Sequence, residues 1–116
     1  MDELLKELKE WGCDIDGAMD RLDHDTELYS DCLQMFKDDP SFDALAKAVK
    51  DGDIQAGFDQ AHTIKGVAAN LGLSPIWQNV FPLVEIFRAG KSEGSQEAYA
   101  KLAQSLQEYR DILAKN

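Results

Sequence analysis

Basic residues are scarce in this sequence of 116 residues. Lysine and arginine together number 12, against 22 aspartates and glutamates, and the formal net charge at pH 7 is -10. A field of this sign repels phosphodiester backbones and anionic lipid head groups. We therefore expect neither nucleic acid nor a membrane surface among the partners of this protein.

Cysteines and long apolar runs are also in short supply. Cys13 and Cys32 are too few for a disulfide framework and too far apart for a CxxC motif, which favours reduced thiols in a cytoplasmic protein. No stretch approaches the ~18 consecutive apolar residues of a membrane span, and the acidic first residues lack the pattern of a signal peptide. With 44% hydrophobic residues, the chain suits one domain over residues 1–116.

Strand-like alternation is absent, and apolar residues recur at helical spacing along the whole chain. The predicted helices are two short ones, ending near Gly12 and Leu22, and five longer ones at about 26–37, 40–51, 54–71, 74–88 and 95–114. Short connections favour antiparallel neighbours. We therefore expect an all-α fold, an antiparallel up-and-down four-helix bundle with one or two short extra N-terminal helices. Pro82 lies inside a predicted helix, where we expect a kink.

The predicted helix from Ile54 to Leu71 contains the main candidate site. Its apolar residues form one broad face toward the core, and His62 points away from that face. The neighbours of His62 on the helix surface are Gln55, Phe58, Asp59, Lys65, Gly66 and Ala69. We expect an exposed imidazole beside one cation and two very small residues. Because most surface histidines are inert, the position alone does not define a function.

A phosphoryl group on His62 would explain these surroundings. Such a group carries about two negative charges, toward which Lys65, one turn further on, can extend its ammonium. Gly66 costs about 1 kcal/mol relative to alanine inside a helix. Its missing side chain, like the short one of Ala69, would let a partner's carboxylate come close enough for in-line transfer.

This motif resembles that of the histidine-containing phosphotransfer (HPt) family: Ala-His, an aliphatic residue, Lys-Gly, small residues and a second glycine six positions later. The matching residues are Ala61, His62, Ile64, Lys65, Gly66, Ala68, Ala69 and Gly72. The likeness also includes "LYSDCLQMFKDD", "LAKAVKDGDIQAGFDQAHTIKG" and "LVEIFRAG". It covers the chain from about Asp14 to Leu113.

The resemblance implies that His62 accepts a phosphoryl group from the aspartyl phosphate of one receiver domain and passes it to another. Lys65 would stabilise the phosphoryl group. The docking surface would consist of Gln55, Phe58, Asp59, Gly66 and Ala69. The partners would be response-regulator receiver domains and a hybrid sensor kinase. The protein would be a monomeric carrier rather than an enzyme and would have no cofactor of its own, since the receiver supplies Mg²⁺.

Some HPt proteins place a glutamine or glutamate of the following helix near the phosphoryl group, and Gln78 and Glu85 are both candidates for this role.

The sequence contains no glycine-rich nucleotide loop, so ATP binding is not expected. An alternative function is a helical docking or scaffolding module in which His62 is never phosphorylated. A metal-dependent hydrolase is disfavoured, because His24 and His62 are the only histidines and lack paired ligand spacing.

Overall fold

The computed structural model describes residues 2–116, and helices account for most of this range. The helices are α1 (Asp2–Trp11), α2 (Ile15–Arg21), α3 (Thr26–Lys37), α4 (Pro40–Asp51), α5 (Ile54–Asn70), α6 (Ser74–Arg88) and α7 (Ser95–Ala114). The predicted all-α class is confirmed, and the helix bounds agree closely with those expected from the sequence. None of the helices within residues 2–116 combines the length and apolarity needed to cross a membrane.

Aspartate side chains begin four of these helices. Asp14, Asp25, Asp39 and Asp53 each accept a hydrogen bond from a backbone N–H in the first turn of the helix that follows. These amides have no carbonyl partner within the helix, so each cap stabilises its helix and fixes its starting residue. The sequence could therefore predict these boundaries from local chemistry alone.

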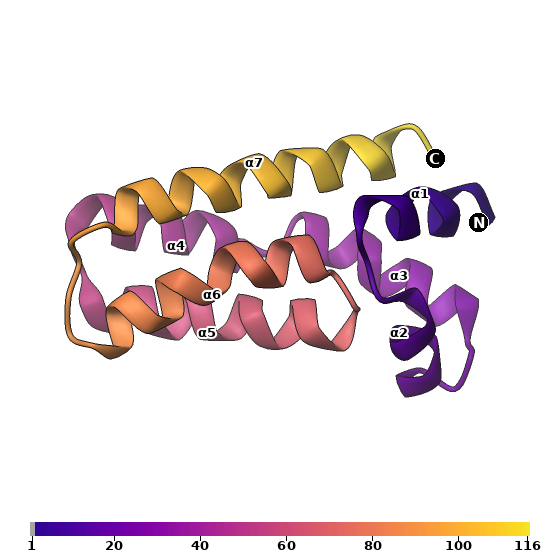
Figure 1. Ribbon diagram of the computed structural model, residues 1–116, viewed down its shortest axis with the longest axis horizontal. Coiled ribbons are helices and arrows are strands. Elements are labelled where there is room, and N and C mark those ends of the chain that lie inside the picture. Colours follow the sequence, from indigo (N-terminus) through magenta and orange to yellow (C-terminus); the bar gives the residue numbers. More distant parts are fainter. Residues whose placement is uncertain (1) are drawn as a thin grey trace.

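The four helices α4 to α7 lie side by side (Figure 1). Helix α5 packs against both α4 and α6, and α7 packs against α6 and, less extensively, against α4. In Figure 1, α4 and α6 run toward the left and α5 and α7 run toward the right. Helix α3 precedes α4, while α1 and α2 lie at the opposite end of the molecule from the α6–α7 connection.

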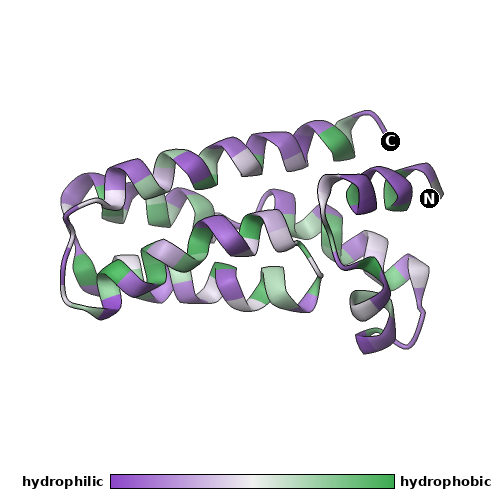
Figure 2. Ribbon diagram, viewed as in Figure 1, coloured by the Kyte–Doolittle hydropathy of each residue, from purple (hydrophilic) through white to green (hydrophobic). Residues whose placement is uncertain are grey.

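Each long helix contributes one apolar stripe to the interior. Figure 2 shows hydrophobic and hydrophilic residues alternating along α6 and α7 as the helices turn. The largest fully buried side chains include Tyr29, Tyr109 and Phe42. Tyr109 Oη donates a 2.6 Å hydrogen bond to the Leu33 carbonyl, which satisfies a polar group inside the core. Helix α6 continues unbroken across Pro82, whose side chain is exposed.

The turn between α5 and α6 requires glycine at position 72. Gly72 has φ of +69°, a conformation that residues with a Cβ rarely adopt, and a Cβ there would collide with the Asp14 carbonyl oxygen. The backbone N–H of Asp14 donates a 2.8 Å hydrogen bond to the Gly72 carbonyl. Gly72 thus ends α5 and also allows the segment before α2 to pack closely against that end.

Candidate functional site

His62 lies in the middle of α5 with its side chain exposed, as predicted. Its ring stacks on Phe58, one turn earlier, with centroids 5.5 Å apart and an interplanar angle of 24°. Neither ring nitrogen forms a hydrogen bond with another residue between 2 and 116. The exposed imidazole is therefore oriented by an apolar contact, and both nitrogens lack a hydrogen-bond partner among the described residues.

Gly66 leaves open space beside His62. A Cβ built at this position meets no atom within 4 Å outside its own helix backbone, and the residue is exposed. Ala69, one turn further along the same flank, is also exposed. Close packing therefore does not account for the glycine. On this flank of α5, Gly66 and Ala69 leave space over which another molecule could approach the ring.

Lys65 is half-buried because its side chain extends across α6. Its Nζ lies 5.2 Å from the ring centroid of Phe81 and 5.9 Å from that of Trp77. The two rings stack on each other at 5.1 Å with an interplanar angle of 25°. Sequence reasoning placed Lys65 beside His62 but missed both aromatic partners. Their spacing of four residues, off the core stripe of α6, was the available signal.

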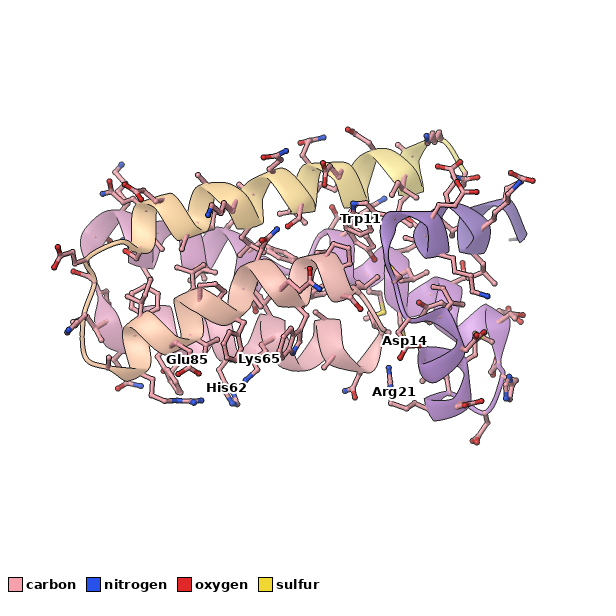
Figure 3. All side chains as sticks on the ribbon, viewed as in Figure 1. Trp11, Asp14, Arg21, His62, Lys65 and Glu85 are labelled. Carbon is pink, nitrogen blue, oxygen red and sulfur yellow. The ribbon has the colours of Figure 1, made fainter. Side chains whose placement is uncertain are left out.

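Arg88 and Glu85 form the other end of this α6 flank. The Arg88 guanidinium carbon lies 5.7 Å from the Phe58 ring centroid, and Arg88 Nη1 lies 3.1 Å from Glu85 Oε1. Phe81, Glu85 and Arg88 share one side of the helix because they are separated by about one turn each. Figure 3 shows Glu85, His62 and Lys65 along the same edge of the molecule.

The two candidate partners from α6 therefore occupy different positions. Glu85 lies between Phe81, which contacts Lys65, and Arg88, which contacts Phe58. Gln78 instead lines a small cavity near the C-terminal end of α5, together with Ala69 and Gly72. Phe81 lies within one turn of both Gln78 and Glu85, whereas Arg88, which contacts Phe58, lies within one turn of Glu85 alone.

The remaining predicted docking residues lie on the same side of α5, one or two turns before His62. Gln55 and Asp59 are exposed, and Gln55 Nε2 donates a 2.9 Å hydrogen bond to Asp59 Oδ1. The half-buried Phe58 lies under the imidazole. Helix α5 thus places Gln55, Phe58 and Asp59 on the same side as His62, with Gly66 and Ala69 one and two turns after it.

The C-terminal end of α5 is held by residues from the N-terminal part of the chain. Arg21 donates from Nε to the Asn70 carbonyl at 3.0 Å and from Nη2 to the Ala69 carbonyl at 2.8 Å. Tyr29 Oη donates a 2.7 Å hydrogen bond to the Leu71 carbonyl, and burial raises the pKa of the Tyr29 phenol. These donors satisfy carbonyls that α5 leaves without partners. They make α5 a firm support for His62.

His24 has no such surroundings. It lies in the turn before α3 with 71% of its side chain exposed, and its Nε2 is 3.0 Å from Asp20 Oδ1. Within residues 2–116, no group of three His, Cys, Asp or Glu side chains is arranged to hold a metal ion.

Comparison with protein families identifies one matching model, that of the Hpt domain, over residues 27–112. This range contains α5, α6 and every residue assigned above to the surroundings of His62. Curated proteins and solved structures gave no match to the chain.

Proposed function

The chain belongs to the Hpt domain family, and on that premise we propose that His62 is the residue that carries the phosphoryl group. Hpt domains are phosphocarrier modules that serve phosphotransfer in phosphorelays and interact with receiver domains. The observation that most supports His62 is its exposed ring on α5, with no hydrogen-bond partner among residues 2–116 and with bare backbone at Gly66. In this chain, the His62 imidazole would be the group that carries the phosphoryl group.

The transfer step needs a nucleophilic ring nitrogen and an electrophilic phosphorus. A lone pair of the His62 imidazole would attack the aspartyl phosphate of a receiver domain in line with the P–O bond. A P–N bond forms as the P–O bond breaks, and the electron pair of that bond returns to the receiver's carboxylate. The reverse step, with a second receiver, passes the phosphoryl group on. The receiver's acidic pocket and Mg²⁺ would supply the rest of the chemistry.

The residues around His62 then have separate roles. Lys65 would stabilise the negative phosphoryl group, and Glu85 is the α6 carboxylate we assign to its vicinity. Gly66 and Ala69 would admit the receiver, while Gln55, Phe58 and Asp59 would contact it. We further propose that α4 to α7 act as an antiparallel four-helix bundle within a single domain of residues 1–116. The protein would be a cytoplasmic monomer served by a hybrid sensor kinase.

A labelling experiment tests the assignment. The protein is mixed with a panel of receiver domains carrying ³²P on their aspartates, and acid-labile, alkali-stable label on the chain is measured. Wild type and His24→Gln should be labelled equally, whereas His62→Gln should take up none. His24→Gln is the matched control because it removes the other histidine of the sequence, which lies far from α5 in the chain. Label persisting in His62→Gln would refute the site.

Phosphoramidate, a small phosphoryl donor, separates the site from the partner. If it labels His62 while no receiver does, His62 is competent and the expected receiver partners are wrong. If neither donor labels the chain, a docking or scaffolding module becomes the better description. Phosphorylation of the His62 imidazole is therefore the result that decides between the two functions.

A further inference from the structure

Two aromatic side chains of α6, Trp77 and Phe81, lie on the flank of the helix beside its core stripe, and Trp77 packs in part against the core. The core stripe of α6 consists of Ile76, Val80, Leu83, Val84 and Phe87, all buried. Phe81 is 37% exposed, and Trp77 is half-buried. An exposed phenylalanine loses the stabilisation that burial would give it. Both rings also contact the Lys65 ammonium of α5.

The contact has the geometry of a cation–π interaction with a stacked pair. Both centroids lie within the distance of about 6 Å over which a ring quadrupole attracts an ammonium, at 5.2 Å for Phe81 and 5.9 Å for Trp77. No carboxylate lies within salt-bridge distance of Lys65 Nζ among the described residues. Between residues 2 and 116, the rings are thus the groups that orient this ammonium.

We propose that Trp77 and Phe81 are positioning residues that hold the Lys65 ammonium beside His62 and release it to the phosphoryl group once that group is attached. The inference rests on the function proposed above. A lysine side chain has a large rotamer entropy, which is lost when the ammonium pairs with an anion. If the rings already restrict the Lys65 side chain before phosphorylation, less rotamer entropy is lost when the ammonium pairs with the phosphoryl group. A charge-assisted hydrogen bond to phosphate is stronger than an exposed cation–π contact, so the ammonium moves to the phosphate.

The first measurement is the rate at which phosphoramidate phosphorylates His62. In this reaction the P–N bond to the protonated amine breaks and ammonia leaves, while a ring-nitrogen lone pair forms the new P–N bond. Because the donor is small, the rate does not depend on receiver docking. The variants are Phe81→Leu, the pair Trp77→Leu with Phe81→Leu, and the conservative Phe81→Tyr, each with Lys65 present and with Lys65→Ala.

We expect the double leucine variant to react about two- to fivefold more slowly than wild type, because an unrestricted lysine side chain loses more rotamer entropy when it pairs with the phosphoryl group. Phe81→Tyr should react at the wild-type rate, since it keeps the ring. In the Lys65→Ala background the same substitutions should have no effect. Equal rates with and without the rings, or an equal slowing in both backgrounds, would overturn the inference. Far-ultraviolet circular dichroism and the melting midpoint verify that each variant is folded.

The second measurement uses Trp77 as a reporter. The chain has two tryptophans, so Trp11→Phe leaves Trp77 as the single indole. In that background, phosphorylation should change the Trp77 emission as the ammonium leaves the ring, and Lys65→Ala should abolish the change. An unchanged emission in protein shown by gel shift to be phosphorylated overturns the release step and with it the inference. Failure of wild type to accept phosphate from any donor overturns the proposed function as well.

Discussion

The two faces of α5 use glycine for opposite purposes. On the inward face, a Cβ at Gly57 would lie 2.6 Å from the Phe87 ring, so the absent side chain makes room for α6. On the outward face, a Cβ at Gly66 would meet nothing within 4 Å. One glycine is required by packing within the molecule. Gly66 leaves space that the described residues do not fill, as expected if a binding partner approaches there.

Aromatic residues show the same division. Phe87, on the inward side of α6, is buried and fills the space above Gly57. Trp77 and Phe81, on the flank of the same helix, remain partly exposed and contact a charge. The inward side of α6 thus packs in the core, and its flank contacts the Lys65 ammonium of α5. Substitutions on the two sides should accordingly affect different measurements.

Gly66→Leu should have the largest effect, a loss of transfer in a protein that remains folded. A leucine in the open space would hold a receiver away from His62, and a displacement of about 1 Å can slow a transfer step about 10²-fold. The rate from a phosphorylated receiver is the measurement. Replacing a helical glycine should raise the free energy of unfolding by about 0.5–1 kcal/mol.

Two controls make the Gly66→Leu test specific. Phosphorylation by phosphoramidate should proceed at the wild-type rate, because that donor requires little space. Ala100→Leu places the same side chain at an exposed position of α7 and should leave receiver transfer unchanged. Wild-type transfer from receivers to Gly66→Leu would remove the docking explanation for this glycine.

Gly57→Leu should have the converse effect. The leucine would overlap the Phe87 ring, and overpacking of this kind costs about 1–3 kcal/mol of unfolding free energy. Urea denaturation measures this loss. The transfer rate per folded molecule should remain near wild type, because the residue faces the interior. Adding Phe87→Ala should recover part of the lost stability by making room for the leucine. A Gly57→Leu protein with wild-type stability and defective transfer would contradict the expectation that the inward face of α5 affects stability and the outward face affects transfer.

Tyr29→Phe tests whether the end of α5 can be weakened without affecting its outward face. The change leaves the buried Leu71 carbonyl without its donor, at a cost of about 1–2 kcal/mol. Burial raises the pKa of Tyr29, so the unfolded chain loses this proton first and stability falls as the pH rises above about 10. The variant should lose less stability than wild type between pH 9 and about 11. Identical alkaline profiles would argue against this linkage.

Local chemistry explains why the helices could be predicted from the sequence. Aspartate caps, Pro40 at the start of α4 and glycines after α4 and α5 act within one turn of the chain. The outward position of His62 follows from helical periodicity alone. These features need no knowledge of how the helices pack, so the sequence predicts them well.

The contacts between helices could not be predicted in the same way. Periodicity places Lys65 near His62 on α5, but the rotation of α6 against α5 decides that its ammonium meets Trp77 and Phe81. The same rotation places Arg88 over Phe58. Rotation depends on core packing over the whole interface, such as Phe87 against Gly57. A single sequence without contacts leaves that quantity undetermined.

Lys65→Ala should have the smallest effect and the clearest dependence on conditions. Exposed charge interactions contribute about 0.2–1 kcal/mol, so phosphorylation of His62 should slow by no more than about fivefold with helicity unchanged. The loss should shrink between 0.05 and about 0.5 M salt, since added ions screen exposed charges. Lys65→Arg is the matched control, because it keeps a cation able to lie over Phe81. A loss independent of salt would mean that Lys65 acts by direct contact in a water-excluded site, and the outward face of α5 would then be less open than Gly66 indicates.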